Sequence, residues 1–180
     1  MDHSYSDQAG ATTASVASRS HPALTTMEIN MSETGSVESF PAMLRRMLGD
    51  RLRPDAETFP DMFAVDGILE YPYAPPGLNT PIAGREAIVA NFQRIRKLLR
   101  IDGVADGSEI KANDPDMIVL EFSGRGEGVI TKEAYNQRYI SVIRLRDGSI
   151  VHYKDYWNPI ALLEAVKGNE TTRGLTIDYV

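Results

Sequence analysis

The chain has 180 residues, of which 42% are hydrophobic, and carries a formal net charge of −6 with an isoelectric point near 5.1. This length and composition suit a single domain with one buried core. The negative charge argues against nucleic-acid binding, which depends on clustered Lys and Arg. Because the sequence has no cysteine and only three scattered histidines, neither a disulfide nor a transition-metal site is expected.

The N-terminal residues 1–35 are rich in Ser, Thr and Ala and show no hydrophobic periodicity. Such a segment buries too little apolar surface to offset the entropy that it would lose on ordering. We therefore predict a flexible N-terminal tail. Met27 and Met31 are alternatives to Met1 as the first residue of the protein.

Neither a membrane anchor nor a signal peptide is visible in the sequence. No run approaches the roughly 20 apolar residues that cross a bilayer, and the chain starts with acidic rather than apolar residues. The absence of cysteine agrees with a reducing compartment. We therefore expect a cytoplasmic protein that does not bind membranes.

Hydrophobic spacing predicts three helices in the first half of the chain. The first begins after Ser39 as N-cap and ends at Gly49, with apolar residues at i, i+3, i+4, i+7 and i+8. A second, short helical stretch covers residues 59–63. The third opens at Gly84. Its apolar stripe consists of Ile88, Phe92, Ile95 and Leu99.

The second half of the chain is rich in β-branched and aromatic residues, which favour strands. Residues 68–73, 117–122, 129–145 and 150–157 are the predicted strands, separated by Gly, Pro, Asp and Asn. Helices followed by a run of antiparallel strands indicate an α+β domain with the helices on one face of the sheet.

The turn at Asp147-Gly148 is compatible with a two-residue loop or with a three-residue loop and a bulge. The choice decides which residues share a face of the sheet, because a shift of one residue exchanges the faces. A three-residue loop places Tyr139 and Ser141 beside the last strand's candidate face, and a two-residue loop places Arg138 and Ile140 there. That face consists of Tyr153, Asp155 and Trp157.

Three segments, in this order and spacing, resemble the SnoaL-like, nuclear-transport-factor-like superfamily. They are FAVDGILE at residues 63–70, IAGREAI at 82–88, and the run from Tyr139 to Asn158 that contains RDG and DYWNP. The resemblance implies a cone-shaped α+β domain over residues 36–168, followed by a C-terminal tail over 169–180. Its curved, mostly antiparallel sheet would carry three helices on the concave face, around a pocket for a small hydrophobic molecule.

The branches that the sequence resembles most are the SnoaL-like polyketide cyclases and the PhzA/PhzB-like phenazine-biosynthesis proteins, with steroid delta-isomerase more distant. By this resemblance, Asp155 matches a pocket carboxylate of the phenazine-type proteins and Trp157 a pocket tryptophan of the steroid isomerases. Tyr71 stands at the position of the isomerase base and Ser141 at that of its second acid. Asn91 replaces the histidine of the phenazine-type pocket.

Asp155 is the candidate catalytic residue. A carboxylate between aromatic side chains on one face of a strand should lose solvation, which raises its pKa and suits it to general acid–base catalysis. The structural alternative is that Asp155 forms an ion pair with an arginine or caps a loop. The Tyr71 and Tyr139 hydroxyls and the Trp157 indole are candidate donors to an oxyanion, or else line the pocket.

These observations favour an enzyme that isomerises, cyclises or dehydrates a small hydrophobic or aromatic substrate without a metal or organic cofactor. The alternatives are a ligand-binding module that does not react with its ligand, and a protein adaptor. The expected substrate-binding residues are Tyr71, Asn91, Tyr139, Ser141, Tyr153 and Trp157. A homodimer is also expected, because one sheet face mixes apolar and polar groups. That face is predicted to carry Ile140, Val142, Ile150, His152 and Tyr156.

Overall fold

The computed structural model describes residues 37–78 and 80–173, so the predicted N-terminal tail and the candidate first residues lie outside the described part of the chain. The helices are α1 (Phe40–Leu48), α2 (Arg85–Leu98) and α3 (Pro159–Lys167), with 3-10 turns η1 (Gly49–Arg51), η2 (Pro60–Met62) and η3 (Asn169–Thr171). The strands are β1 (Phe63–Glu70), β2 (Ile82–Ala83), β3 (Leu99–Ile110), β4 (Met117–Gly128), β5 (Ala134–Arg146) and β6 (Ser149–Tyr156).

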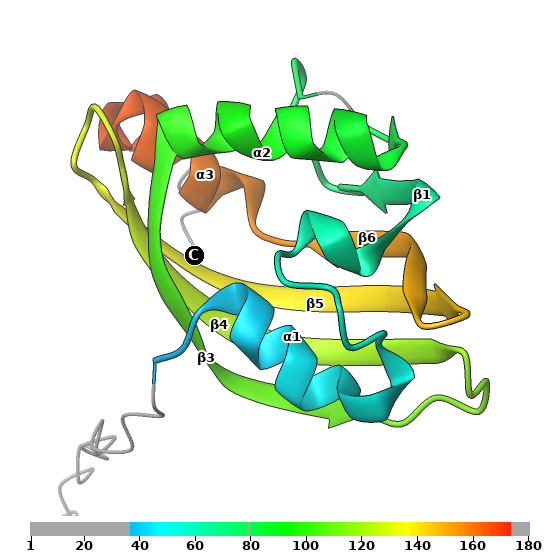
Figure 1. Ribbon diagram of the computed structural model, residues 1–180. Helices are drawn as coiled ribbons and strands as arrows, with labels where there is room; N and C mark the ends of the chain where they lie inside the picture. Colours follow the sequence, from blue (N-terminus) through cyan, green and yellow to red (C-terminus); the bar gives the residue numbers. More distant parts are fainter. Residues whose placement is uncertain (1–36, 79, 174–180) are drawn as a thin grey trace, which may run out of the picture. The chain divides into compact units, whose positions relative to one another are not determined.

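The strands form one sheet in the order β2-β1-β6-β5-β4-β3, in which β1 and β6 run parallel and every other neighbouring pair is antiparallel. Figure 1 shows β3, β4 and β5 curving around α1, with α2 and α3 across the other end of the sheet. Bulges in β3 promote this curvature, because an extra residue bends a strand and increases its twist. The predicted α+β fold with a curved, mostly antiparallel sheet is confirmed.

Helix α1 has the ends that the sequence predicts. The Ser39 side chain accepts a hydrogen bond from the Ala42 amide, which satisfies one of the free donors of the first turn. Gly49 follows the last residue with φ of 52°, a conformation that glycine adopts without steric cost. No helix among the described residues is long and apolar enough to cross a membrane.

The β5–β6 hairpin combines a two-residue loop with a bulge. Asp147 and Gly148 both have positive φ, 50° and 70°, as in a tight hairpin turn. Leu145 pairs with Ile150, but the preceding residue of β5, Arg144, pairs with His152, so Val151 is an extra residue in β6. The bulge shifts the register by one further residue. Tyr139 and Ser141 therefore share a face with Tyr153 and Asp155, as the three-residue loop predicts.

The bulge also corrects one prediction. Ile150 was expected on the outer face with His152 and Tyr156, but it precedes the bulge and its side chain is fully buried in the core. The outer face of β5 and β6 therefore carries Ile140, Val142, His152, Lys154 and Tyr156 instead.

Two strands and one helix were not predicted, and the shorter of these strands is β2, which has two residues and pairs with β1. Strand β3 contains Gly and Asp residues that are rare in strands, and it lies at the edge of the sheet with two register shifts. Helix α3 is only nine residues long and begins directly after β6, with Asn158 as N-cap and Pro159 in its first turn. The strand predicted from residue 129 begins at Ala134, because residues 129–133 form the turn from β4.

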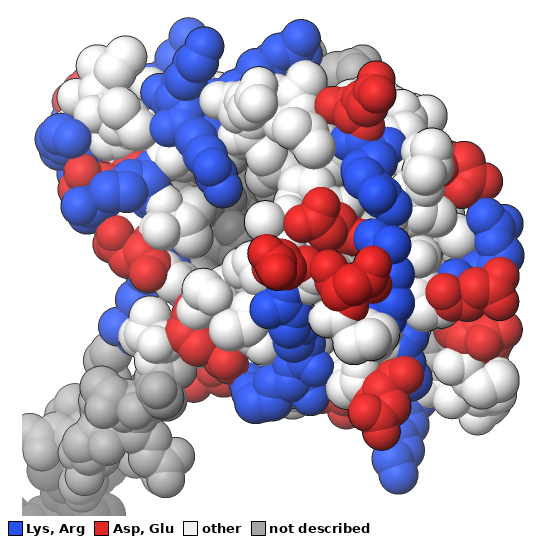
Figure 2. All heavy atoms as spheres, viewed as in Figure 1, with Lys and Arg blue, Asp and Glu red and all other residues white. Residues whose placement is uncertain are grey.

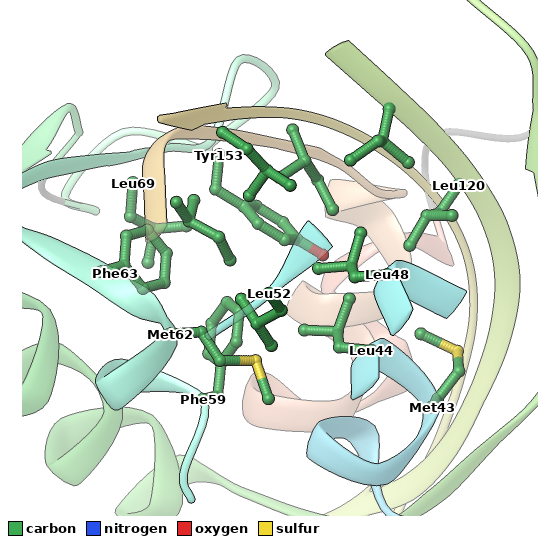
Figure 3. Close-up of a cluster of buried hydrophobic side chains, with 14 of the residues drawn as sticks. Met43, Leu44, Leu48, Leu52, Phe59, Met62, Phe63, Leu69, Leu120 and Tyr153 are labelled. Atoms are coloured by element: carbon green, nitrogen blue, oxygen red, sulfur yellow. The ribbon is translucent and has the colours of Figure 1, made fainter. Parts of the chain in front are cut away.

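The large core lies between the inner face of the sheet and helices α1 and α2, and Figure 3 shows its central side chains. Tyr153 projects from β6 into this cluster, where its ring packs edge-on against Phe59 with a centroid distance of 5.3 Å. A second cluster consists of Leu99, Tyr135 and Ala165, with Ile95, Leu162 and Val166 packed against it. Between them the two clusters join all three helices to the sheet.

Candidate functional site

A cavity of about 980 Å³ opens between the helices and the inner face of the sheet. On the face shown in Figure 2 the surface is hollowed beneath α2. Five of the residues predicted from sequence line this cavity, namely Tyr71, Tyr139, Tyr153, Asp155 and Trp157. The other two, Asn91 and Ser141, lie behind the wall and hydrogen-bond to residues that line it.

Asp155 lies on the inner face of β6, directly opposite Ser141 of β5. The Ser141 hydroxyl donates to Asp155 Oδ1 over 2.8 Å, and the Tyr153 hydroxyl donates to Ser141 Oγ over 2.7 Å. Ser141 and Tyr153 are fully buried, so this chain of hydrogen bonds is fixed by the core. Asp155 Oδ1 is therefore held in place, whereas Oδ2 has no hydrogen-bond partner among the described residues, and the residue lines the cavity.

The surroundings of Asp155 raise the pKa of its carboxyl group to about 7. Burial is the main cause because it disfavours the charged form, and the hydrogen bond from Ser141 opposes it. The residue as a whole is partly accessible, and it is one of those that line the cavity. Asp155 forms no ion pair with a Lys or Arg among the described residues. The predicted alternative, in which Asp155 is paired with an arginine, is therefore not observed there.

Tyr71 and Trp157 form one wall beside Asp155. Their rings meet edge-on with centroids 5.8 Å apart. Asn91 of α2 donates its side-chain amide to the Tyr71 hydroxyl oxygen over 3.1 Å, which leaves the Tyr71 proton available to another acceptor. Burial, and then the charge of Asp155, raise the pKa of Tyr71 well above its usual range, so it remains a donor.

A second pair of tyrosines lies on β5. The Tyr139 hydroxyl donates to the Tyr135 hydroxyl over 3.1 Å, and burial raises the pKa of Tyr135 to about 12. The Tyr139 ring stacks on Phe122 with centroids 4.8 Å apart. Gly124 allows this position, because a Cβ atom there would lie 2.8 Å from the Tyr139 ring. The charge of Asp155 also raises the pKa of both hydroxyls, so that they remain protonated. The site therefore combines one carboxyl group with several neutral donors.

Gln137, also on the inner face of β5, fixes the chain just after Trp157. Its side chain donates to the Asn158 carbonyl over 2.7 Å and accepts from the Asn158 amide over 3.0 Å. This double hydrogen bond anchors the start of α3 against β5. Neither Gln137 nor Tyr135 was among the predicted site residues, although both alternate with Tyr139 and Ser141 and therefore share their face.

No group of three or more His, Asp and Glu side chains that could hold a metal ion occurs within residues 37–78 and 80–173. The polar groups at the cavity wall around Asp155 are tyrosine hydroxyl groups and the Trp157 indole. Such a set is suited to hydrogen bonding and proton transfer on a bound organic molecule.

Known proteins share both sequence and fold with this chain. The SnoaL-like domain family matches residues 44–153. An uncharacterised PhzA/B-like protein of Pseudomonas aeruginosa is 41% identical over 116 residues, which are 64% of this chain and 82% of that protein. The uncharacterised protein YesE of Bacillus subtilis is 32% identical over 126 residues, covering 70% of this chain and 86% of that protein.

Among solved structures, a Bacillus subtilis protein proposed to be an isomerase superposes with a TM-score of 0.61 and 32% identity, over 71% of this chain and 92% of that one. A phenazine biosynthesis-related protein of P. aeruginosa shares the fold at 14% identity and a TM-score of 0.54, over 82% and 93% of the two chains. The family match spans more than half of the sequence and agrees with the resemblance found there. The chain belongs to the SnoaL-like domain family.

Proposed function

We propose that this protein is an enzyme in which Asp155 moves a proton on a small hydrophobic or aromatic substrate, next to a carbonyl group, in an isomerisation, cyclisation or dehydration. The observation that carries the proposal is the state of Asp155. Its Oδ1 is held by Ser141, its Oδ2 has no hydrogen-bond partner among the described residues, and the residue lines the cavity with a pKa of about 7, which suits proton transfer near neutral pH.

The proton moves as follows. Asp155 Oδ2 accepts the proton from the carbon beside the carbonyl. The electron pair of that C–H bond forms the C=C bond of an enolate, and the π pair of the C=O bond moves to the oxygen. The Tyr71 hydroxyl, whose oxygen already accepts from Asn91, donates to this oxygen and stabilises its charge. In an isomerisation, protonated Asp155 returns the proton to another carbon of the enolate. In a dehydration it protonates a hydroxyl group, which leaves as water when its C–O bond breaks. In a cyclisation the enolate carbon forms a bond to a second carbonyl carbon, and protonated Asp155 gives its proton to the oxygen of that carbonyl.

The experiment that tests the proposal is a screen of polyketide-like, steroid-like and phenazine-like ketones with the purified protein in D₂O. Mass spectrometry and NMR report products and the uptake of deuterium beside the carbonyl. Asp155→Asn should slow exchange and turnover at least about 100-fold, because general acid–base groups contribute at least this much. Glu70→Gln, which removes a carboxylate from the outer face of the same sheet, should leave both rates unchanged.

Activity should also depend on pH through Asp155. Since the unprotonated carboxylate is the base, kcat/KM should fall about tenfold for each pH unit below about 7, in line with a carboxyl pKa of about 7. The residual kcat/KM of Asp155→Asn should not show this fall below pH 7. If the wild-type protein binds compounds from the screen but exchanges no proton and forms no product, the protein is a ligand-binding module and the enzymatic proposal fails.

A further inference from the structure

Charged side chains gather at the opening of the cavity. Besides Asp155, seven of them line it, and they come from different elements. The cations are Arg96, Arg100, Lys132 and Lys167, and the anions are Glu57, Asp102 and Glu127. Lys and Arg side chains from the α2 side border the hollow in Figure 2.

Four of these seven side chains neutralise one another. Arg100 forms ion pairs with Asp102 over 3.2 Å and with Glu127 over 3.5 Å. Lys132 reaches Glu127 over 3.2 Å. Two positive and two negative charges thus form one exposed network, which has no excess charge to offer a ligand.

Arg96 and Lys167 are left without an ion-pair partner among the described residues. Arg96 follows Ile95 and Lys167 follows Val166, and both of these apolar residues pack against the second cluster. The two cations therefore belong to the part of the cavity wall near that cluster. The third unpaired charge, Glu57, belongs to another segment, two residues before Phe59 of the large core. The end of the cavity between α2 and α3 therefore carries two positive charges that have no ion-pair partner among the described residues.

Helix geometry explains only part of this arrangement. Both cations lie in the last turn of a helix, where a positive charge is favourable. Lys97 shares the last turn of α2 with Arg96, is also exposed, and does not line the cavity. Comparison of Arg96 with Lys97 can therefore separate an effect on the cavity from an effect on the helix.

We propose that the cavity takes an amphipathic ligand whose aromatic or aliphatic body lies on the apolar wall and whose anionic end, a carboxylate or sulfonate, lies beside Arg96 and Lys167. The apolar wall between these cations and Asp155 includes Ile95, Leu99, Leu162, Val166, Tyr135 and Tyr139. The ligand thus enters with one direction, which presents its uncharged end to Asp155. This inference rests on the proposed use of the cavity as a ligand site, but it is independent of turnover.

Two probes that differ only in an anionic group test the proposal, namely 1-anilinonaphthalene-8-sulfonate and its neutral parent N-phenyl-1-naphthylamine. Binding is followed by energy transfer from Trp157, the only tryptophan of the chain, which lines the cavity and so reports binding there. The sulfonate should bind more tightly than the neutral parent, and added salt should reduce the difference.

The variants localise the effect. The double variant Arg96→Glu/Lys167→Glu should weaken sulfonate binding about tenfold and leave binding of the neutral parent unchanged, as expected for reversal of two exposed charges. Lys97→Glu should change neither. Equal affinity of the two probes, no binding of the sulfonate, or the same loss in Lys97→Glu as in the double variant would overturn the proposal. Since no reaction is measured, failure here leaves the test of proton transfer by Asp155 intact.

Discussion

Two carboxylates on neighbouring strands face opposite sides of the same sheet and have different surroundings. Glu70, at the end of β1, lies on the outer face with His152 Nε2 at 2.9 Å and Lys154 Nζ at 3.7 Å. Asp155 of β6 lies on the inner face, where its hydrogen-bond partner is the neutral hydroxyl of Ser141. The outer carboxylate has a lysine, a histidine and water around it, and the inner one has no Lys or Arg partner among the described residues. The face on which each carboxylate lies therefore decides which groups surround it.

The largest expected consequence is a pH dependence of stability that belongs to Asp155. Its folded-state pKa is raised from an ordinary value near 4 to about 7, so the folded protein holds this proton more tightly than the unfolded chain. The stabilisation is complete below about pH 4 and is lost as pH rises to about 7. The loss amounts to about 4 kcal/mol.

Urea unfolding at a series of pH values measures this effect. Asp155→Asn should remove it, so that the difference in unfolding free energy between wild type and variant changes by about 4 kcal/mol from pH 4 to pH 8. Glu70→Gln serves as the matched control, and its difference from wild type should change much less over this interval. If Asp155→Asn keeps the pH dependence of the wild type, burial does not raise the pKa of Asp155.

The contrast between the two faces was only partly predictable from sequence. The alternation of Tyr153, Asp155 and Trp157 predicted one shared face, because strand side chains alternate strictly. The choice of its neighbours on β5 depended on the loop, and neither candidate loop alone describes the hairpin. The extra residue Val151 decides the register, and whether a strand bulges there depends on packing that no local pattern encodes. The same bulge explains why the prediction for Ile150 was wrong.

Helix and strand prediction failed where local signals were weak or ambiguous. Strand β3 has polar and glycine residues, and as an edge strand it is held mainly by its pairing with β4. Its first residues nevertheless form part of the cavity wall, including Leu99 and Arg100. The residues that line the cavity near α3 belong to β3 and α3, and neither element was predicted. This end of the cavity could therefore not be predicted from the sequence. The Asp155 end depends on β5 and β6, whose patterns are clear.

A smaller effect is expected from the partner of Asp155. Ser141→Ala removes the hydrogen bond that lowers the carboxyl pKa, so the pKa of Asp155 should rise further. It also leaves the buried Tyr153 hydroxyl without its acceptor, and a loss of about 1–3 kcal/mol is expected. Chemical denaturation gives the stability, and titration of the Asp155 carboxyl by NMR gives the pKa.

Ser123→Ala is the matched control for this variant. Ser123 donates to Asp106 Oδ2 over 2.8 Å, the same distance as between Ser141 and Asp155, but at the surface. Water replaces the lost partner there, so the change in stability should stay below about 0.5 kcal/mol. Equal losses in the two variants would show that burial does not distinguish the two serine–aspartate pairs.

The smallest effect is expected at Glu70 itself. Glu70→Gln breaks a pair that is partly exposed, with 29% of the Glu70 side chain and 34% of the His152 side chain accessible. Such pairs contribute less than about 1 kcal/mol, because water solvates both partners when they separate. Salt should reduce the difference from wild type further, as measured by urea unfolding at low and high ionic strength. A loss comparable to that of Ser141→Ala would mean that the outer face is shielded from water in solution, as it would be if a second copy of the chain covered it.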